Sequence, residues 1–364
     1  MYNSFYKKLT IHKPNADDKM YVLSEQEINA IRKIERNAIL GSALIGAAMV
    51  LLLYLPQYYF SDFFGDVNYK IPFLNIDFPF SFLSFSYGMI LVFLEIVLLT
   101  FLNIYSAHYI AVATGFINES NKLDEAKSSA ILGIGKEKKD KKILSLGINP
   151  YQGLSNKSVF LLNLFFTLKA TLSNLLIRIF VKRVLGRYAV REVLDMLGIP
   201  IFAFWNAYAT HKVLKETRLI IMGNNLVNEI KQKLPALNLS DTEKEIVYDT
   251  LQFVAMNKRD FHNNHYYLSK NVLEFYNINI KPQHVCPPNY ISVLNQQNDA
   301  IKKLCSFILV CGFVLDGQIS MREKNKIKKL NGLGFFTDDA EQVESYCKNF
   351  INGKGIEELE KKYL

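Results

Sequence analysis

The chain has 364 residues, 50% of them hydrophobic, and its 43 lysines and arginines against 34 acids give a net charge of +9. A mean hydropathy of +0.07 is above that of an ordinary soluble enzyme, so we expect part of the chain to lie in lipid. The basic excess falls in residues 120–240, which hold 19 basic and 8 acidic residues. Because this segment follows a strongly apolar region, its charge favours contact with anionic membrane headgroups over contact with nucleic acid.

The N-terminal residues 1–37 are polar and contain no cleavable signal peptide, so we expect a cytosolic segment and a first apolar helix that serves as the targeting signal. Ser24 and Glu27 have the spacing of a capping box, which predicts a helix start just after Ser24. This helix should continue into a first membrane span at about 38–57, ended by Pro56.

A second apolar stretch at about 82–105, with a helical extension, is predicted to follow a short loop at 61–81. The two spans would form a transmembrane hairpin over 38–118. Basic residues flank both ends of this hairpin, namely Arg32, Lys33, Arg36, Lys122 and Lys127. The positive-inside rule therefore places both termini of this multi-pass protein on the cytosolic side of an inner (cytoplasmic) membrane.

Glu95 lies near the middle of the second span. An acid there costs about 2.5–3.5 kcal/mol unless it is protonated or paired, so we expect Glu95 to face protein and not lipid. Two interpretations remain open. Glu95 either takes part in a proton or ion relay or an oligomer contact, or it is a protonated acid that hydrogen-bonds to a neighbouring helix without a transport role.

Small residues form a stripe on the first span, where Ala38, Ser42 and Gly46 recur at four-residue spacing. Such a stripe allows close approach of two helix backbones. We expect the stripe to pack on the second span, and a contact between two copies of the chain is the alternative.

Two segments are predicted after the hairpin. Residues 119–157 have the lysines, glycines and proline of an exposed basic linker, and residues 158–233 are predicted to form a basic membrane-proximal helical domain. The apolar helices of that domain would lie in the membrane interface, form a soluble core or make additional spans. Arg183, Arg187 and Arg191 share one helix face, which suits anionic lipid phosphates or a solvated surface partly neutralised by nearby acids.

The C-terminal part, residues 234–364, has the pattern of an ordinary globular domain, and Ser240 with Glu243 predicts another capping box. Helices are expected after Ser240 and near 263–276, 293–314, 321–331 and 338–351. Because no period-two alternation typical of strands is found, the predicted fold class is all-α.

The chain offers little sign of catalytic chemistry. It contains no nucleophile elbow, Gly-rich phosphate loop or paired carboxylates on a helix face, and its four cysteines lack a C-x-x-C pair. His262, His265, His284 and Cys286 are residue types that bind zinc, but their spacing fits no closed four-ligand site. We therefore expect no metal, no cofactor and no enzymatic activity.

The stretch Phe307–Leu330 reads FILVCGFVLDGQISMREKNKIKKL and combines an apolar helix, a turn at Asp316 and Gly317, and a capping box at Ser320 and Glu323. This stretch resembles the helical repeat of the TerB-like (tellurite-resistance) domains. The resemblance implies a TerB-like helical domain at 234–364. It also implies that Asp316 and Glu323 correspond to acidic residues proposed to bind metal in that family.

An earlier stretch with a similar pattern has only Asp260 beside the basic Lys258 and Arg259, which argues against a metal site in this chain.

Taken together, the predicted hairpin, the basic segment and the helical C-terminal domain favour a non-enzymatic membrane scaffold or adaptor. It would present a cytosolic interaction domain to a protein partner, in a stress-response or membrane-associated complex. The alternative is an oligomeric channel, pore or transporter component that uses Glu95 and the apolar middle helices. Membrane lipids and a second copy of the chain are further expected partners, and nucleic acid is not.

Overall fold

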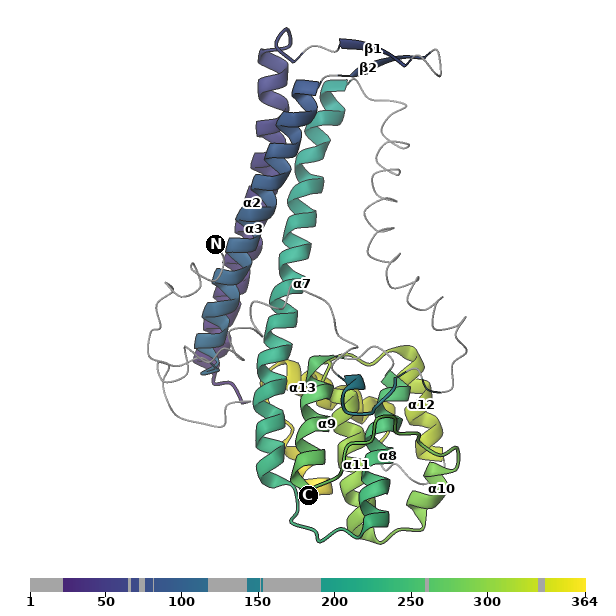
Figure 1. The fold of residues 1–364 in the computed structure, drawn as a ribbon. Helices are drawn as coiled ribbons and strands as arrows, with labels where there is room; N and C mark the ends of the chain where they lie inside the picture. The colour runs from purple at the N-terminus through teal and green to yellow at the C-terminus, as the bar shows by residue number, and fades with distance from the viewer. Residues whose placement is uncertain are drawn as a thin grey trace. The chain divides into compact units, whose positions relative to one another are not determined.

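The computed structural model is α-helical, as predicted, with one two-stranded ribbon among the residues it describes (Figure 1). Described are residues 22–64, 67–71, 76–80, 82–116, 143–150, 152, 191–258, 262–332 and 338–364. They divide into two compact units. The bundle unit contains 31–109 and 191–215, and the C-terminal unit contains 22–30, 110–116, 143–152 and the described residues from 216 onward.

Three long helices supply the bundle unit, and Figure 1 shows them side by side: α2 (Glu25–Tyr59), α3 (Phe82–Ala113) and the first half of α7 (Arg191–Lys233). A Cβ atom added at Gly41 of α2 would lie 3.5 Å from Leu102 of α3, and one added at Gly198 of α7 would lie 3.5 Å from Val50 of α2. Both α2 and α3 are long and apolar enough to cross a membrane. The predicted pair of apolar helices is therefore present, and α7 packs beside them.

Two prolines lie inside these helices, where the sequence predicted interruptions. Helix α2 passes Pro56 and continues to Tyr59, so the prediction that Pro56 ends the helix is wrong. A proline removes one N–H donor but keeps its carbonyl, and the Pro56 carbonyl accepts a hydrogen bond from the Phe60 amide at 2.9 Å. Pro200 is likewise contained in α7.

Helix α7 also changes the predicted domain boundaries. Residues 158–233 were expected to form one separate membrane-proximal domain, but α7 is a single helix of 43 residues whose first part belongs to the bundle unit and whose second part belongs to the C-terminal unit. The second part contacts α9 (Asn263–Phe275), where the Asn264 side chain donates to the Leu219 carbonyl at 2.9 Å. The backbone of this helix is continuous. Its two parts belong to different units because they are buried against different sets of neighbours.

The predicted loop between the two apolar helices contains strands β1 (Val67–Ile71) and β2 (Ile76–Phe80). They pair antiparallel with Val67 opposite Phe80 and Ile71 opposite Ile76. Such pairing satisfies backbone groups that a short loop would leave to water. The segment is too short to show a clear alternation, which is why the sequence predicted only a loop.

The C-terminal unit is built around α11 (Asp299–Val314), in which every residue from Leu304 to Val314 is buried. A helix that is apolar on all sides must be covered on all sides. Its neighbours are α8, α10, α13 and α14, and α12 contacts α8 and α13. The bounds are α8 Asp241–Lys258, α10 Tyr290–Asn295, α12 Met321–Gly332, α13 Ala340–Ile351 and α14 Glu357–Tyr363.

The helix predicted at 293–314 is two helices, α10 and α11. One continuous helix does not form because Asn298 is the N-cap of α11. Its side chain accepts a hydrogen bond from the Ile301 amide at 2.9 Å, which starts a new helix there. Helix α14 was not predicted. The predicted capping boxes at Ser24, Ser240 and Ser320 are present, each with the glutamate three residues later.

Residues 143–150 were predicted as part of an exposed linker, and this prediction is wrong for them. Ile143 and Ile148 are fully buried in the C-terminal unit. The Gln252 side chain accepts a hydrogen bond from the Asn149 amide at 2.8 Å and donates to the Asn149 carbonyl at 2.7 Å. One side chain therefore satisfies both backbone groups of Asn149, as the backbone of a neighbouring β-strand would.

Candidate functional site

Glu95 of α3 meets α7 in the bundle unit. The Asn206 side chain of α7 donates a hydrogen bond of 2.6 Å to the Glu95 carboxylate. Gly46 of α2 lies against the same place, because a Cβ atom there would be 2.7 Å from Asn206 Nδ2 and 2.8 Å from the Phe202 carbonyl. The expected contact of Glu95 with a neighbouring helix is therefore made by α7, a helix outside the predicted hairpin.

The small-residue stripe is buried at all three predicted positions, Ala38, Ser42 and Gly46. It was expected to pack on the second apolar helix, but Gly46 packs on the α7 backbone, whereas Gly41 contacts Leu102 of α3. The sequence left open whether this part of α7 lies in the membrane interface, in a soluble core or in the membrane, because Asp195, Gly198 and Pro200 interrupt its apolar run. Asn206 within this apolar stretch was the available signal, because polar side chains in such helices hydrogen-bond across to neighbouring helices.

Glu95 gives a first testable prediction. Glu95→Gln should insert and assemble normally, since an amide oxygen can accept the same hydrogen bond from Asn206, whereas Glu95→Lys should disrupt assembly by placing a second donor and a fixed charge there. Native gels of mild-detergent extracts compare the two variants. Equal migration of Glu95→Lys and the parent would contradict the contact with Asn206.

The predicted arginine stripe lies mostly outside the described residues. Arg183 and Arg187 belong to that undescribed part, and Arg191 is the first residue of α7. The contact of these arginines with lipid headgroups stays a prediction.

The residues of the turn predicted to be TerB-like come together around a lysine. Gly317 has a φ of +64°, which glycine adopts without strain. Lys258 Nζ lies 2.8 Å from both carboxylate oxygens of Asp316, 3.1 Å from the Gln318 carbonyl and 3.1 Å from Glu323 Oε1. The lysine side chain is 1% exposed. This ammonium group fills the oxygen shell between Asp316 and Glu323, so the acidic pair does not fit a metal ion as the structure stands.

The histidines named as zinc candidates fall into two groups. His262 and His265 cap the start of α9. The His265 ring accepts a hydrogen bond from the His262 amide, and the His262 ring accepts one from the Asn264 amide. Burial, with the nearby Lys258 and His262, lowers the pKa of His265 to about 3, so this ring is neutral and contacts the Gly312 carbonyl at 2.8 Å. His284 lies in a different place, against α8 beside Asp249.

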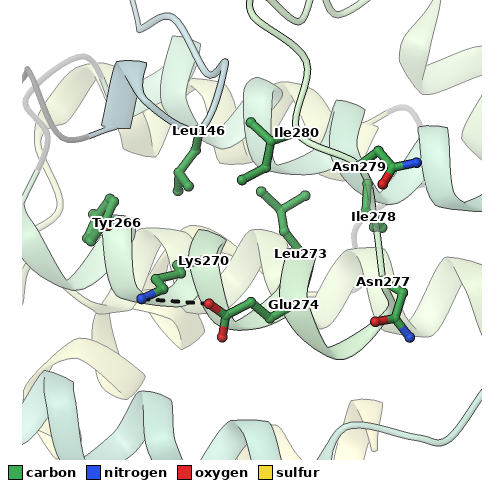
Figure 2. Close-up of a pocket in the computed structure, with 9 residues that line it drawn as sticks. All are labelled: Leu146, Tyr266, Lys270, Leu273, Glu274, Asn277, Ile278, Asn279 and Ile280. Atoms are coloured by element: carbon green, nitrogen blue, oxygen red, sulfur yellow. Dashed lines mark ion pairs between the residues drawn. The ribbon is translucent and has the colours of Figure 1, made fainter.

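A pocket of about 370 Å³ opens on the C-terminal unit beside α9 (Figure 2). Leu146, Leu273 and Ile280 gather around it, and Figure 2 shows the ion pair of Lys270 with Glu274 along its side. The remaining lining residues are Tyr266, Asn277, Ile278 and Asn279. An apolar hollow with a charged and amide rim has the composition of a small binding site. The pocket could not be predicted from the sequence, because Leu146 lies far from α9 along the chain.

Comparison with known proteins identifies no relative: no protein-family model, curated protein or solved structure matches the chain. Function therefore has to be argued from the Glu95 contact, the Lys258 cluster and the pocket themselves.

Proposed function

We propose that the protein is a non-enzymatic membrane adaptor, anchored by α2 and α3, that presents the C-terminal unit to a protein partner in the cytosol. The observation that carries this proposal is the exposure of α3. Its most apolar 18-residue window has a mean hydropathy of 2.2, yet only 6% of that window is buried. A core helix of a soluble protein would be covered, and so apolar a helix left bare in water would aggregate, which makes lipid the fitting surround.

The polar ends of the hairpin support an inner-membrane, multi-pass arrangement with both termini in the cytosol. Arg32, Lys33 and Arg36 precede the apolar part of α2, and the strands β1 and β2 would lie on the opposite side of the membrane. Anionic headgroups are the proposed lipid contact of Arg183, Arg187 and Arg191.

The C-terminal unit is the proposed interaction domain, and we propose that it is TerB-like. Its turn at Asp316 and Gly317, followed by the capped α12, supports that assignment. The pocket beside α9 is the proposed contact for the partner. Leu273 and Ile280 form an apolar wall, and the ion pair of Lys270 and Glu274 lies at the rim. This combination suits an amphipathic segment of a protein.

A single cysteine in the pocket tests both the topology and the contact. Ile280 is 51% exposed, so Ile280→Cys should fold normally. The native cysteines should stay silent because all four are buried, and burial raises the pKa of Cys286 and Cys305 to about 12. We expect a membrane-impermeant maleimide to label position 280 only after the cells are permeabilised. A photo-crosslinker attached there should then join the protein to its partner.

Met321→Cys is the matched control, since Met321 is 76% exposed in the same unit and does not line the pocket. It should be labelled in the same way and give little of the cross-linked product. Labelling of position 280 from outside intact cells would contradict the cytosolic placement. Equal cross-linking from positions 280 and 321 would contradict the pocket as the contact.

A channel or transporter component is the second candidate function, and two buried polar atoms on α3 and α7, the helices that carry Glu95 and Asn206, favour it. Thr210 follows Asn206 by one turn of α7 and is 1% exposed. Within the part of the chain that the structure describes, its hydroxyl and the Asn103 side-chain oxygen have no hydrogen-bond partner. If Glu95 relays protons, the parent protein should conduct protons into proteoliposomes. Glu95→Gln should lose this flux while it still assembles normally. Absence of flux from the parent protein would exclude this candidate.

A further inference from the structure

Two carboxylates of α8 surround His284 in the C-terminal unit. Glu245 and Asp249 are four residues apart on α8, so their side chains project from the same helix face. His284 Nε2 lies 2.8 Å from Asp249 Oδ1, and its Nδ1 lies 3.6 Å from Glu245 Oε1. One donor atom from each of the three residues can be chosen so that all lie within 4.8 Å of one another.

The imidazole is fixed before anything binds. The His284 amide donates to the Gly147 carbonyl at 2.8 Å, and the ring stacks on Tyr248 with a centroid distance of 3.9 Å and an interplanar angle of 4°. The side chains of His284 and Asp249 are only 2% and 8% exposed. A ligand set held in this way loses little conformational entropy when it binds an ion.

Lys281 is the cation now beside these residues. Its Nζ lies 2.5 Å from Glu245 Oε1, and the two side chains are 49% and 43% exposed. An ion pair as exposed as this contributes little to stability, so the lysine can turn into solvent at small cost. Glu245 can therefore be released for another cation.

We propose that Glu245, Asp249 and His284 bind a divalent transition-metal ion with the ligand preferences of Zn²⁺, and that Lys281 competes for the same carboxylate. One imidazole nitrogen and two carboxylate oxygens are common zinc ligands, and water would complete the coordination. Tetrahedral zinc separates its ligand atoms by about 3.3 Å. The ligand atoms lie within 4.8 Å of one another, so a movement of up to roughly 1.5 Å by the partly exposed Glu245 side chain closes the site. Binding would fasten His284, and with it the Gly147 segment, to α8.

The three proposed ligands are not neighbours in the sequence, which is why no metal site was predicted. Along the chain His284 lies nearest to Cys286 and the other histidines, whereas the structure brings it to Asp249, 35 residues earlier, and to Glu245 on the same helix. Glu245 and Asp249 are four residues apart on one helix face, so the expectation that the chain has no paired carboxylates on a helix face is wrong.

The test uses the full chain in detergent micelles, titrated with Zn²⁺ alone and followed by calorimetry and by the metal retained after dialysis. We expect one zinc ion per chain and no comparable response to Mg²⁺, which disfavours a nitrogen ligand. Glu245→Gln should weaken binding by roughly tenfold or more. Lys281→Gln should instead tighten it, because the competing ammonium group is gone.

His211→Gln is the control, since His211 is exposed and belongs to the bundle unit. It should leave zinc binding unchanged, and the buried cysteines should add no background. The proposal fails if neither the parent nor Lys281→Gln retains zinc. It also fails if Glu245→Gln binds zinc as tightly as the parent, because the ion would then lie elsewhere.

Discussion

Replacing Lys258 with methionine is expected to destabilise the C-terminal unit by about 3–5 kcal/mol, the usual cost of leaving a buried charge without its partner. The variant removes the ammonium group that lies between Asp316 and Glu323 and leaves two carboxylates in a largely water-free place. Hydrogen exchange of the α11 amides in the full chain measures the effect. Protection should fall by roughly two to four orders of magnitude.

Lys270→Met is the matched control, because Lys270 pairs with Glu274 at 3.6 Å with both side chains nearly half exposed. Its effect should stay within about 0.5 kcal/mol. Adding Asp316→Asn and Glu323→Gln to Lys258→Met should restore much of the lost stability, since no uncompensated charge remains. Similar exchange in Lys258→Met and Lys270→Met would show that the cluster is not buried as described.

Gly46→Ala is expected to destabilise the bundle unit by about 1–3 kcal/mol, although alanine is the better helix former. The added methyl group would lie 2.8 Å from the Phe202 carbonyl and 2.9 Å from its carbon, and a backbone cannot move aside as a flexible side chain can. Helix α7 would have to shift away from α2. Thermal unfolding in detergent, followed by circular dichroism, should show a lower midpoint.

Gly41→Ala tests the same substitution five residues earlier on α2. Its methyl group would lie 3.5 Å from Leu102 Cδ2, an ordinary contact distance, so the midpoint should stay the same or rise slightly. If Gly46→Ala raises the midpoint as Gly41→Ala does, α7 does not approach α2 at Gly46.

The sequence by itself determined the features that depend on nearby residues. A run of apolar residues without charges identifies a long helix such as α3, and a serine with a glutamate three residues later identifies a helix start, as at Ser240 and Glu243. Both signals are local. The apolar content of a segment determines whether it is stable in water or in lipid, and the capping hydrogen bonds join groups within a single turn. For the same reason the all-α class could be predicted without knowing how any helix packs.

Only the tertiary structure decided which residues meet. Asn206 reaches Glu95 across 111 residues, Lys258 reaches Asp316 across 58, and His284 reaches Asp249 across 35. No spacing rule connects such pairs, because they depend on which faces of separate helices are buried together. The same holds for residues 143–150, whose polar surroundings predicted a linker. Their backbone is buried because Gln252 of α8 supplies both a donor and an acceptor at the place where Asn149 needs them.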